Sequence, residues 1–137
     1  MRRTPFAEGE FYHVYNRGVD KRIIFEGRPD YERFLFYLQE CNDQHPLLNA
    51  RFYYRGLASI TGDRKRGTRA PLVDILCFCL MPNHFHILLR QREANSASRF
   101  LQKVGTAYTM YFNAKYERTG ALFQGIFKAI HVPHDRY

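Results

Sequence analysis

The sequence predicts an α+β domain in which helices pack on a four-stranded antiparallel sheet. Two apolar runs of seven to nine residues, joined at Met81-Pro82-Asn83, have the length of strands and the turn residues of a hairpin. Two longer segments carry apolar residues at three- and four-residue steps, as amphipathic helices do. With 137 residues, of which 45% are apolar, the chain is expected to form one domain with a proper core.

The first predicted strand runs from Glu10 to Gly18, and the first predicted helix from Pro29 to His45. Alternation divides the side chains of the strand between two faces: Phe11, His13 and Tyr15 on one, Tyr12 and Val14 on the other. In the helix, proline suits the first turn, and apolar residues recur at helical spacing: Tyr31, Phe34, Leu35, Leu38 and Cys41. This stripe indicates core packing and no cofactor.

Residues 46–71 form the least regular segment and are expected to be a basic insertion or loop. Glycine, proline and small hydroxyl residues interrupt it, and cations gather near its end. A basic loop is commonly just solvated, but in a nucleic-acid-binding protein it is also where backbone phosphates are held. On that second interpretation, the candidate phosphate contacts are Arg64, Lys65, Arg66 and Arg69.

The hairpin that follows carries two histidines in its second strand. Both runs, Leu72–Leu80 and His84–Arg90, are almost continuously apolar, which favours central strands covered by helices on at least one face. At a two-residue spacing His84 and His86 project from the same face, roughly 6.6 Å apart along the chain. Two such imidazoles are able to converge on one metal ion, with His13 as a weaker third candidate. The alternative is a pair of hydrogen-bonded core or surface histidines.

A second helix is predicted from Asn95 or Ser96 to about Tyr116, and a last strand from about Phe127 to Val132. The inner face of the helix collects Phe100, Leu101, Val104, Tyr108, Tyr111 and Phe112, whereas Arg99, Lys103 and Lys115 fall mostly outside that face. The order strand, helix, two strands, helix, strand predicts a ferredoxin-like four-stranded antiparallel sheet with helices packed on it.

The composition favours a cytoplasmic nucleic-acid-binding protein. Lys and Arg outnumber Asp and Glu by 21 to 13, and ten tyrosines and twelve phenylalanines are available to stack on bases. A solvated basic surface is the plainer explanation of the net charge of +8. No apolar run is long enough to cross a membrane, and no signal-peptide stretch opens the chain. Three cysteines make no disulfide framework, so reduced thiols are expected.

Three segments resemble a known family. Residues 81–89 read Met-Pro-Asn-His-Phe-His-Ile-Leu-Leu, which is similar to the His-hydrophobic-His (HUH) motif of the single-tyrosine transposases. Residues 13–18 (His-Val-Tyr-Asn-Arg-Gly) and 111–130 resemble the REP-associated tyrosine transposases, a branch related to insertion-sequence transposases that act on single-stranded DNA. The resemblance extends from His13 to Tyr137. It implies a ferredoxin-like domain in which His84 and His86 hold a divalent ion, Mg or Mn, that polarises a scissile phosphate.

By the same resemblance the catalytic helix is truncated. In the family, a tyrosine in the helix after the last strand attacks the phosphate, and a Gln or Asn one turn later completes the metal shell. Asp135-Arg136-Tyr137 resembles the start of that helix. The nucleophile and the third ligand are therefore expected beyond Tyr137, and Tyr137 itself is the lesser candidate. The implied partner is single-stranded, hairpin-forming DNA, held by the basic loop together with Arg99, Lys103, Lys115 and Arg118; a homodimer is implied as well.

The sequence thus predicts one HUH transposase-like domain over residues 1–137, with DNA binding and DNA transposition by single-strand cleavage and strand transfer as its function. One alternative is a non-catalytic DNA-binding module, truncated or domesticated. Another is a structural zinc site made by Cys77, Cys79, His84 and His86. Zinc requires a two-residue hairpin turn, which brings thiols and imidazoles to one face. Pro82 favours the three-residue turn, which puts them on opposite faces.

Overall fold

The structure, a computed structural model, describes residues 5–45 and 70–133. In order, its elements are β1 (Phe11–Arg17), the short 3-10 helix η1 (Val19–Lys21), α1 (Arg28–Glu40), β2 (Val73–Met81), β3 (His84–Gln91), α2 (Ser96–Lys115) and β4 (Lys128–Val132). The predictions for residues 46–69, including Arg64, Lys65, Arg66 and Arg69, and for Tyr137 lie outside the described residues.

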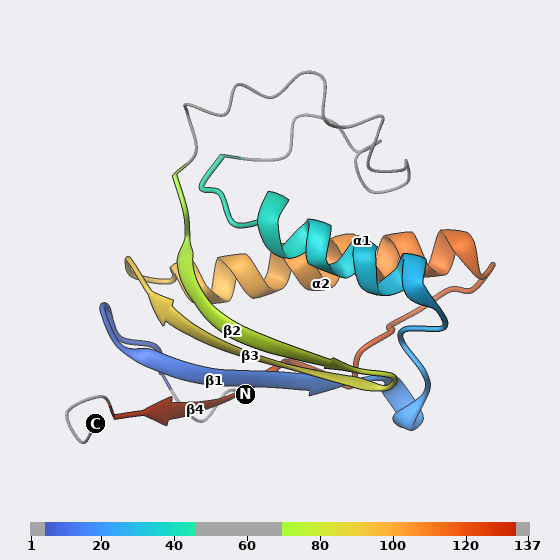
Figure 1. The fold of residues 1–137 in the computed structure, drawn as a ribbon, viewed down its shortest axis with the longest axis horizontal. Coiled ribbons are helices and arrows are strands. Elements are labelled where there is room, and N and C mark those ends of the chain that lie inside the picture. The colour runs from blue at the N-terminus through green and yellow to red at the C-terminus, as the bar shows by residue number, and fades with distance from the viewer. Residues whose placement is uncertain (1–4, 46–69, 134–137) are drawn as a thin grey trace.

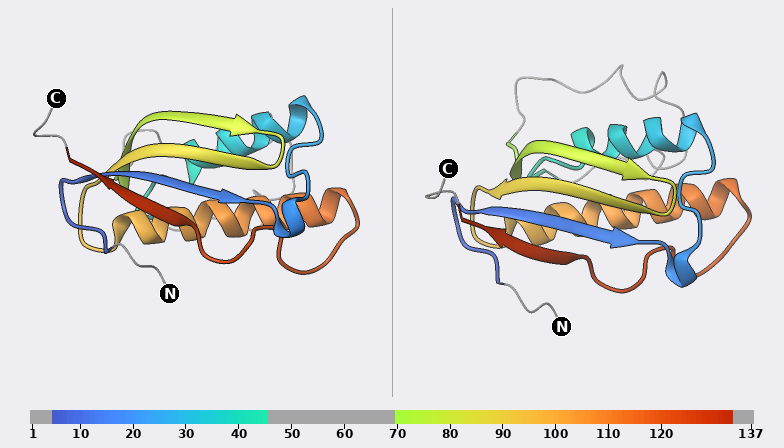
Figure 2. Two further views of the ribbon diagram at one scale, coloured as in Figure 1. Left: turned by 90° about the horizontal axis from the view of Figure 1, so that it is seen from below. Right: turned by 60° about the horizontal axis from the view of Figure 1, so that its bottom comes forward.

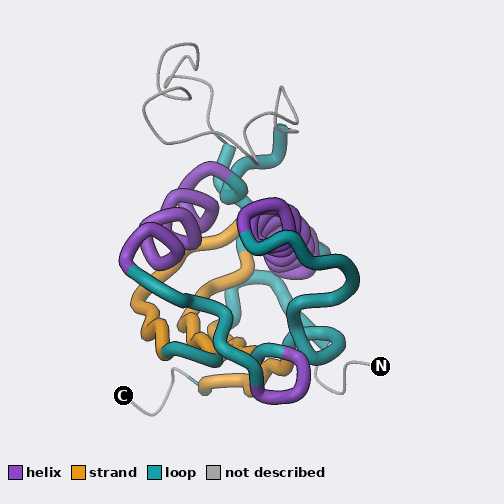
Figure 3. Tube along the Cα trace, turned by 90° about the vertical axis from the view of Figure 1, so that its right-hand side faces the viewer, coloured by secondary structure: helices purple, strands orange, loops and turns teal. Residues whose placement is uncertain are grey.

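The four strands form one antiparallel sheet in the order β2-β3-β1-β4. Both helices lie side by side on one face of the sheet, above it in Figure 1 and seen end-on in Figure 3. The opposite face carries neither helix, and Figure 2 shows the order of the strands from that side. The predicted ferredoxin-like α+β fold is confirmed.

The core fills the layer between the sheet and the helices. Alternate residues of β1 and β3 face this layer, and the apolar stripes of both helices cover it. Its buried members include Tyr12, Val14, Phe34, Leu38, Phe85, Ile87, Leu89, Phe100, Val104, Tyr108 and Phe112. The predicted inner face of the second helix and the predicted faces of the first strand agree with this arrangement.

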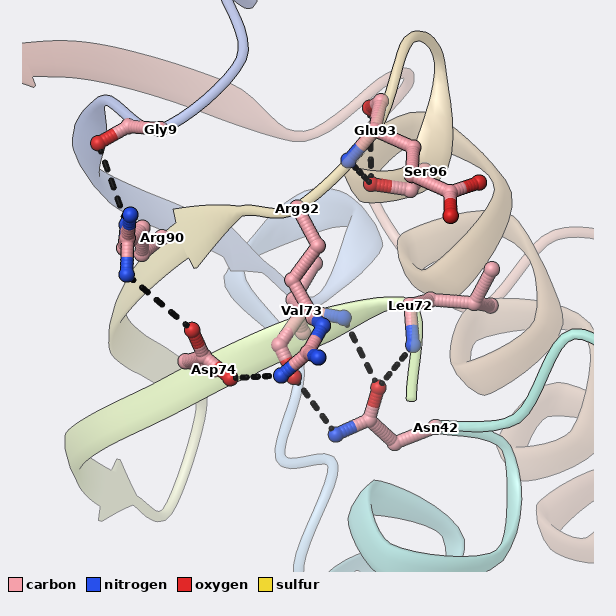
Figure 4. A network of polar contacts seen from close by, with 9 residues as sticks. All are labelled: Gly9, Asn42, Leu72, Val73, Asp74, Arg90, Arg92, Glu93 and Ser96. Carbon is pink, nitrogen blue, oxygen red and sulfur yellow. Dashed lines mark hydrogen bonds and ion pairs between the residues drawn. The ribbon is translucent and has the colours of Figure 1, made fainter. Parts of the chain in front are cut away.

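Helix α1 is shorter than predicted, since it ends at Glu40 and not at His45. The polar residues that follow bind backbone groups in place of continuing the helix. The side chain of Asn42 accepts hydrogen bonds from the N–H groups of Leu72 and Val73 and donates to the carbonyl of Val73, at 2.9–3.0 Å. Figure 4 shows this contact, which fixes the start of β2 beside the end of α1.

Strand β2 lies at an edge of the sheet, although its continuous apolar run predicts a central strand. β1 occupies the place between β3 and β4, which leaves β2 paired on one side only. Its side chains are accordingly half exposed, Leu76 at 50% and Phe78 at 49%. Phe78 borders a shallow cavity with Leu35 and Leu38 of α1. The apolar run therefore reflects contact with the flank of a helix and not burial on both sides.

A buried carboxylate joins the two helices. Asp30, in the first turn of α1, is fully buried and accepts hydrogen bonds at 2.6–2.8 Å from Tyr111 and Lys115 of α2 and from Tyr116, which directly follows α2. The backbone N–H of Glu26 also donates to it. Burial by itself raises the pKa of Asp30, but these donors lower it overall. Asp30 is thus an ionised anchor between the helices.

Candidate functional site

The helix-free face of the sheet, called the open face below, gathers the histidines that the sequence singles out. Strand pairing arranges this face in rows of neighbouring side chains. The row at the hairpin end joins Met81, His84 and Arg17; the next joins Cys79, His86, Tyr15 and Lys128; the third joins Cys77, Leu88, His13 and Ile130. His84 and His86 therefore occupy adjacent rows, and His13 stands one row further along the sheet.

His84 and His86 are close neighbours on the open face. Their ring centres are 5.1 Å apart and their planes meet at 89°. Both side chains are half-buried, since β3 is flanked by β2 and β1. The residues between and after them, Phe85 and Ile87, point into the core instead. The structure thus brings the two predicted ligands together on one surface, outside the hydrophobic core.

Each of the two imidazoles has one ring nitrogen engaged. Nδ1 of His84 lies 2.8 Å from Oδ1 of Asn83; this oxygen only accepts, so His84 donates from Nδ1 and keeps a lone pair on Nε2. Nδ1 of His86 lies 2.8 Å from Nε2 of His13. With His86 as the donor of that bond, its Nε2 also keeps a lone pair. A histidine that binds metal through one nitrogen is commonly oriented by such a bond from the other.

The electrostatics of the open face favour the neutral form of His86. Burial, followed by the neighbouring His13 and His84, lowers the pKa of His86 below its ordinary value. Neutral imidazole is the form that binds metal ions. In this arrangement His13 orients His86, because the Nε2 atom that would make it a third ligand is already used.

The hairpin turn differs from the expected one. Met81 pairs directly with His84, so the turn contains two residues, Pro82 and Asn83. Their carbonyl groups accept hydrogen bonds from the N–H groups of residues 18, 24 and 25, at 2.8–3.1 Å. This support from a distant segment stabilises a short turn that Pro82 alone disfavours. As a result, Cys77 and Cys79 share the open face with the histidines, and their expected position on the opposite face is wrong.

Sharing a face does not create the zinc site that the sequence left open. Cys79 stands opposite His86, whereas Cys77 stands a row further on, and both thiols are exposed. Within the described ranges, no three or more His, Cys, Asp or Glu side chains are grouped so as to hold a metal ion. His84 and His86 supply two nitrogen donors. A divalent ion held by this pair would take its remaining ligands from waters or from the oxygens of a phosphate.

The tyrosines of α2 are committed to the fold. Tyr108 donates to the backbone carbonyl of Ile24, and Tyr111 and Tyr116 both donate to Asp30. Burial raises the pKa of Tyr111 to about 12 and raises that of Tyr108 as well. A buried phenol that is already hydrogen-bonded and hard to ionise makes a poor nucleophile.

Two further side chains contact the histidines, and sequence analysis assigned them no role in the site. The ring centre of Tyr15 lies 5.9 Å from that of His86 and 5.2 Å from that of His13. Asn83 orients His84, as described above. The alternation of the first strand places Tyr15 and His13 on one face, but only the pairing of β1 with β3 brings that face to the histidines.

The predicted DNA contacts on the second helix stand apart from the histidine rows. Arg99 and Lys103 donate to backbone carbonyl groups at residues 43–45, just after α1. Lys115 lies between the two helices, where its Nζ atom pairs with the carboxylate of Asp30 at 2.8 Å. Arg118 follows the C-terminal end of α2, at the same end of the molecule as the β2–β3 turn. The structure therefore does not gather these four cations into one patch.

Comparisons with known proteins give a family and a fold. A family model described as "Transposase IS200 like" matches residues 66–135, half of the chain. Among solved structures, the chain is similar to that of the REP-associated tyrosine transposase bound to a REP hairpin, with a TM-score of 0.59 and 10% identity. That match covers 98% of this chain and 62% of the other, so this chain spans less than two thirds of that protein. No curated protein matches.

Hydropathy adds one observation. In residues 5–45 and 70–133, no helix has the length and apolar character needed to cross a bilayer.

Proposed function

Because this chain belongs to the family of IS200-like transposases, we propose that it binds DNA and cuts and rejoins one strand at the open face of its sheet. The observation that carries the proposal is the pair of half-buried imidazoles, His84 and His86, with Nδ1 engaged and Nε2 available. A sheet stabilised only by packing has no need of such a pair, whereas a phosphate-processing site does.

The residues of the open face fit a divalent ion, Mg or Mn. His84 and His86 would hold it through Nε2, and Asn83 and His13 keep the two rings in the required orientation. When bound, such an ion withdraws charge from the non-bridging oxygens of a phosphate. A third protein ligand would come from outside the described ranges.

The strand-cleavage step requires a tyrosine. Its phenol oxygen forms a bond to phosphorus while the bond from phosphorus to the 3′-oxygen breaks, which gives a 5′-phosphotyrosine and a free 3′-hydroxyl. Reversal of this step rejoins strands. Tyr108, Tyr111 and Tyr116 are committed to the fold, and by the resemblance to the family we assign the nucleophile to the helix expected after β4, either Tyr137 or a residue beyond it.

The substrate is proposed to be single-stranded, hairpin-forming DNA; the name of the similar solved structure says that its own ligand is a REP hairpin. Residues 46–71, with Arg64, Lys65, Arg66 and Arg69, would hold backbone phosphates, assisted by Arg99 and Lys103. We further propose that residues 1–137 act as a single domain, that the protein works in the cytoplasm, and that two copies cooperate.

A cleavage assay tests this function. The chain, and in parallel the chain extended along its reading frame, is incubated with Mn and labelled single-stranded hairpins. We expect a covalent protein–DNA adduct that disappears in His86→Ala and persists in His131→Ala, a control histidine beside Tyr12 and Glu10. An adduct from the extended chain alone assigns the nucleophile beyond Tyr137. Metal-dependent cleavage that survives His86→Ala would overturn the proposed site.

A non-catalytic DNA-binding module is the second candidate. The commitment of Tyr108, Tyr111 and Tyr116 to hydrogen bonds within the fold favours it. In the same assay, this candidate predicts that the chain and the extended chain both bind the hairpins and that neither forms a covalent adduct.

A further inference from the structure

A second group of cations lies at the hairpin end of the sheet, the end that faces the viewer in Figure 3. Arg17, the last residue of β1, pairs with His84 across the sheet. The chain continues through η1 into Lys21 and Arg22, and its backbone donates hydrogen bonds to the turn directly before His84. These cations are therefore close to the proposed site but separate from its ligands.

Arg118 approaches Arg22 from the end of α2. The Cζ atoms of Arg22 and Arg118 lie 5.6 Å and 6.0 Å from the centre of the Phe112 ring. Arg118 is anchored in place, since it donates to Oδ1 of Asn113 and to the carbonyl of Ala121. Burial, followed by the positive charge of Arg22, lowers the pKa of Arg118. The fold thus holds two like charges near one aromatic ring.

Neither guanidinium is neutralised by an acid in the described part of the chain. Asp20 and Glu117 are neighbours in sequence, yet no ion pair joins a described carboxylate to Arg22 or Arg118. Nε of Arg22 is buried and has no hydrogen-bond partner among the described residues. Because the two guanidinium groups repel each other and have no counter-charge among the described residues, this arrangement favours an anion from outside.

At the opposite end of the sheet, the corresponding cations are neutralised by a carboxylate. There Arg90 and Arg92 both reach Asp74, at 3.7 Å and 2.8 Å, and Arg90 also donates to the carbonyl of Gly9, as Figure 4 shows. The two ends carry similar cations, but only the end beside His84 leaves its pair without an anion among the described residues.

We propose that Arg22 and Arg118 form a phosphate-binding site for the DNA strand that reaches His84 and His86, an inference that rests on the proposed DNA-binding function. A guanidinium presents several donors in one plane and matches the oxygens of a phosphate. One phosphate that contacts both guanidinium groups would offset their repulsion. Arg17 pairs with His84 across the sheet and precedes Arg22 in the chain, so one strand running off this end of the sheet would be able to reach all of these groups.

The salt dependence of DNA binding tests the site. A fluorescent hairpin with a single-stranded 5′ extension is bound to the chain at increasing NaCl, and log K is plotted against log salt. For single-stranded DNA, each lost phosphate contact lowers the slope by about 0.7. We expect this decrease in slope for Arg22→Gln. The wild-type side chain of Arg22 makes no hydrogen bond to a described residue, so the substitution breaks none. Arg92→Gln, which removes the same charge from a cation already paired with Asp74, is expected to keep the wild-type slope.

A neutral backbone analogue locates the contact. Single methylphosphonates are placed in turn along the extension. At one position of the extension, we expect the methylphosphonate to weaken DNA binding by the wild type and by Arg92→Gln but not by Arg22→Gln. Arg118→Lys keeps the positive charge and is expected to retain part of this weakening. Equal slopes for Arg22→Gln and Arg92→Gln would overturn the site while leaving DNA binding intact. Absence of DNA binding by the wild type would overturn the proposed function and the site together.

Discussion

Two polar clusters on opposite sides of the same sheet differ in how many of their hydrogen-bonding groups have partners within the cluster. The Asp30 cluster consists of Asp30, Tyr111, Lys115 and Tyr116 and lies between the helices, where every donor reaches the same carboxylate at 2.6–2.8 Å. The histidine cluster consists of His13, Asn83, His84 and His86 and lies on the open face. Its bonds engage one nitrogen of each proposed ligand and leave the other available.

This contrast separates a structural polar cluster from a binding site. A buried cluster is stable only if its hydrogen bonds close on themselves, because an unpaired buried group costs about 1–3 kcal/mol. A cluster at a surface is able to keep unused acceptors at little cost, since water satisfies them until a ligand arrives. On this comparison, we assign the Asp30 cluster to the fold and propose that the histidine cluster serves the function.

The largest effect is expected from removing a proposed metal ligand. His84→Ala or His86→Ala should reduce metal-dependent strand cleavage by about 10³-fold or more, since a bound ion contributes several kcal/mol to the stabilisation of charge in the transition state. The free energy of unfolding should change by less than about 0.5 kcal/mol, because the rings are outside the core. Cleavage kinetics measure the first effect, and urea unfolding of the same preparations measures the second. A large loss of stability would assign the histidines to the fold.

The reverse pattern is expected for the Asp30 cluster. Asp30→Asn should lower the free energy of unfolding by about 3 kcal/mol, because it leaves Lys115 without its counter-charge. DNA affinity, measured under conditions where the variant stays folded, should be unchanged. Asp74→Asn is the matched control on the surface, and its ion pairs should be worth less than about 1 kcal/mol. Equal losses for the two variants would contradict the structural role of the buried carboxylate.

An intermediate effect is expected from His13, which touches a proposed ligand without being one. His13→Ala should weaken Mn²⁺ binding about 10- to 100-fold by freeing the ring of His86 to turn. His13→Gln restores an acceptor at a similar distance and should recover part of the affinity. Mn²⁺ titrations followed by electron paramagnetic resonance separate these outcomes. Complete loss of binding in both variants would make His13 a ligand in its own right.

The smallest effect concerns acid stability. The folded-state pKa of Asp30 is lowered from its ordinary value of 3.8, so its stabilising contribution is complete above about pH 4 and is lost as pH falls through the lowered folded pKa. The difference in unfolding free energy between the wild type and Asp30→Asn should therefore shrink below pH 4, which urea unfolding at a series of pH values measures. A difference that stays constant from pH 7 to pH 3 would show that the fold does not lower the pKa of this carboxyl group.

The parts of the molecule that the sequence predicts well depend on local periodicity. Element order, the inner face of α2 and the shared face of His84 and His86 all follow from the spacing of residues along one element. The turn at Pro82 does not, because its length depends on hydrogen bonds from a segment more than fifty positions away. The same limit applies to Asp30, because only the tertiary structure brings Tyr111 and Lys115 of α2 to its carboxylate. Arg22 is a further example, because only the tertiary structure brings it close to Arg118.

The histidine tautomers provide the sharpest test of a metal site on the open face. Long-range ¹H–¹⁵N spectra of the imidazoles distinguish a proton on Nδ1 from a proton on Nε2. We predict that His84 and His86 both carry the proton on Nδ1 at neutral pH, and that a trace of Mn²⁺ broadens their signals before those of His131. Protons on Nε2 of either ring, or equal broadening of all the histidines, would contradict such a site.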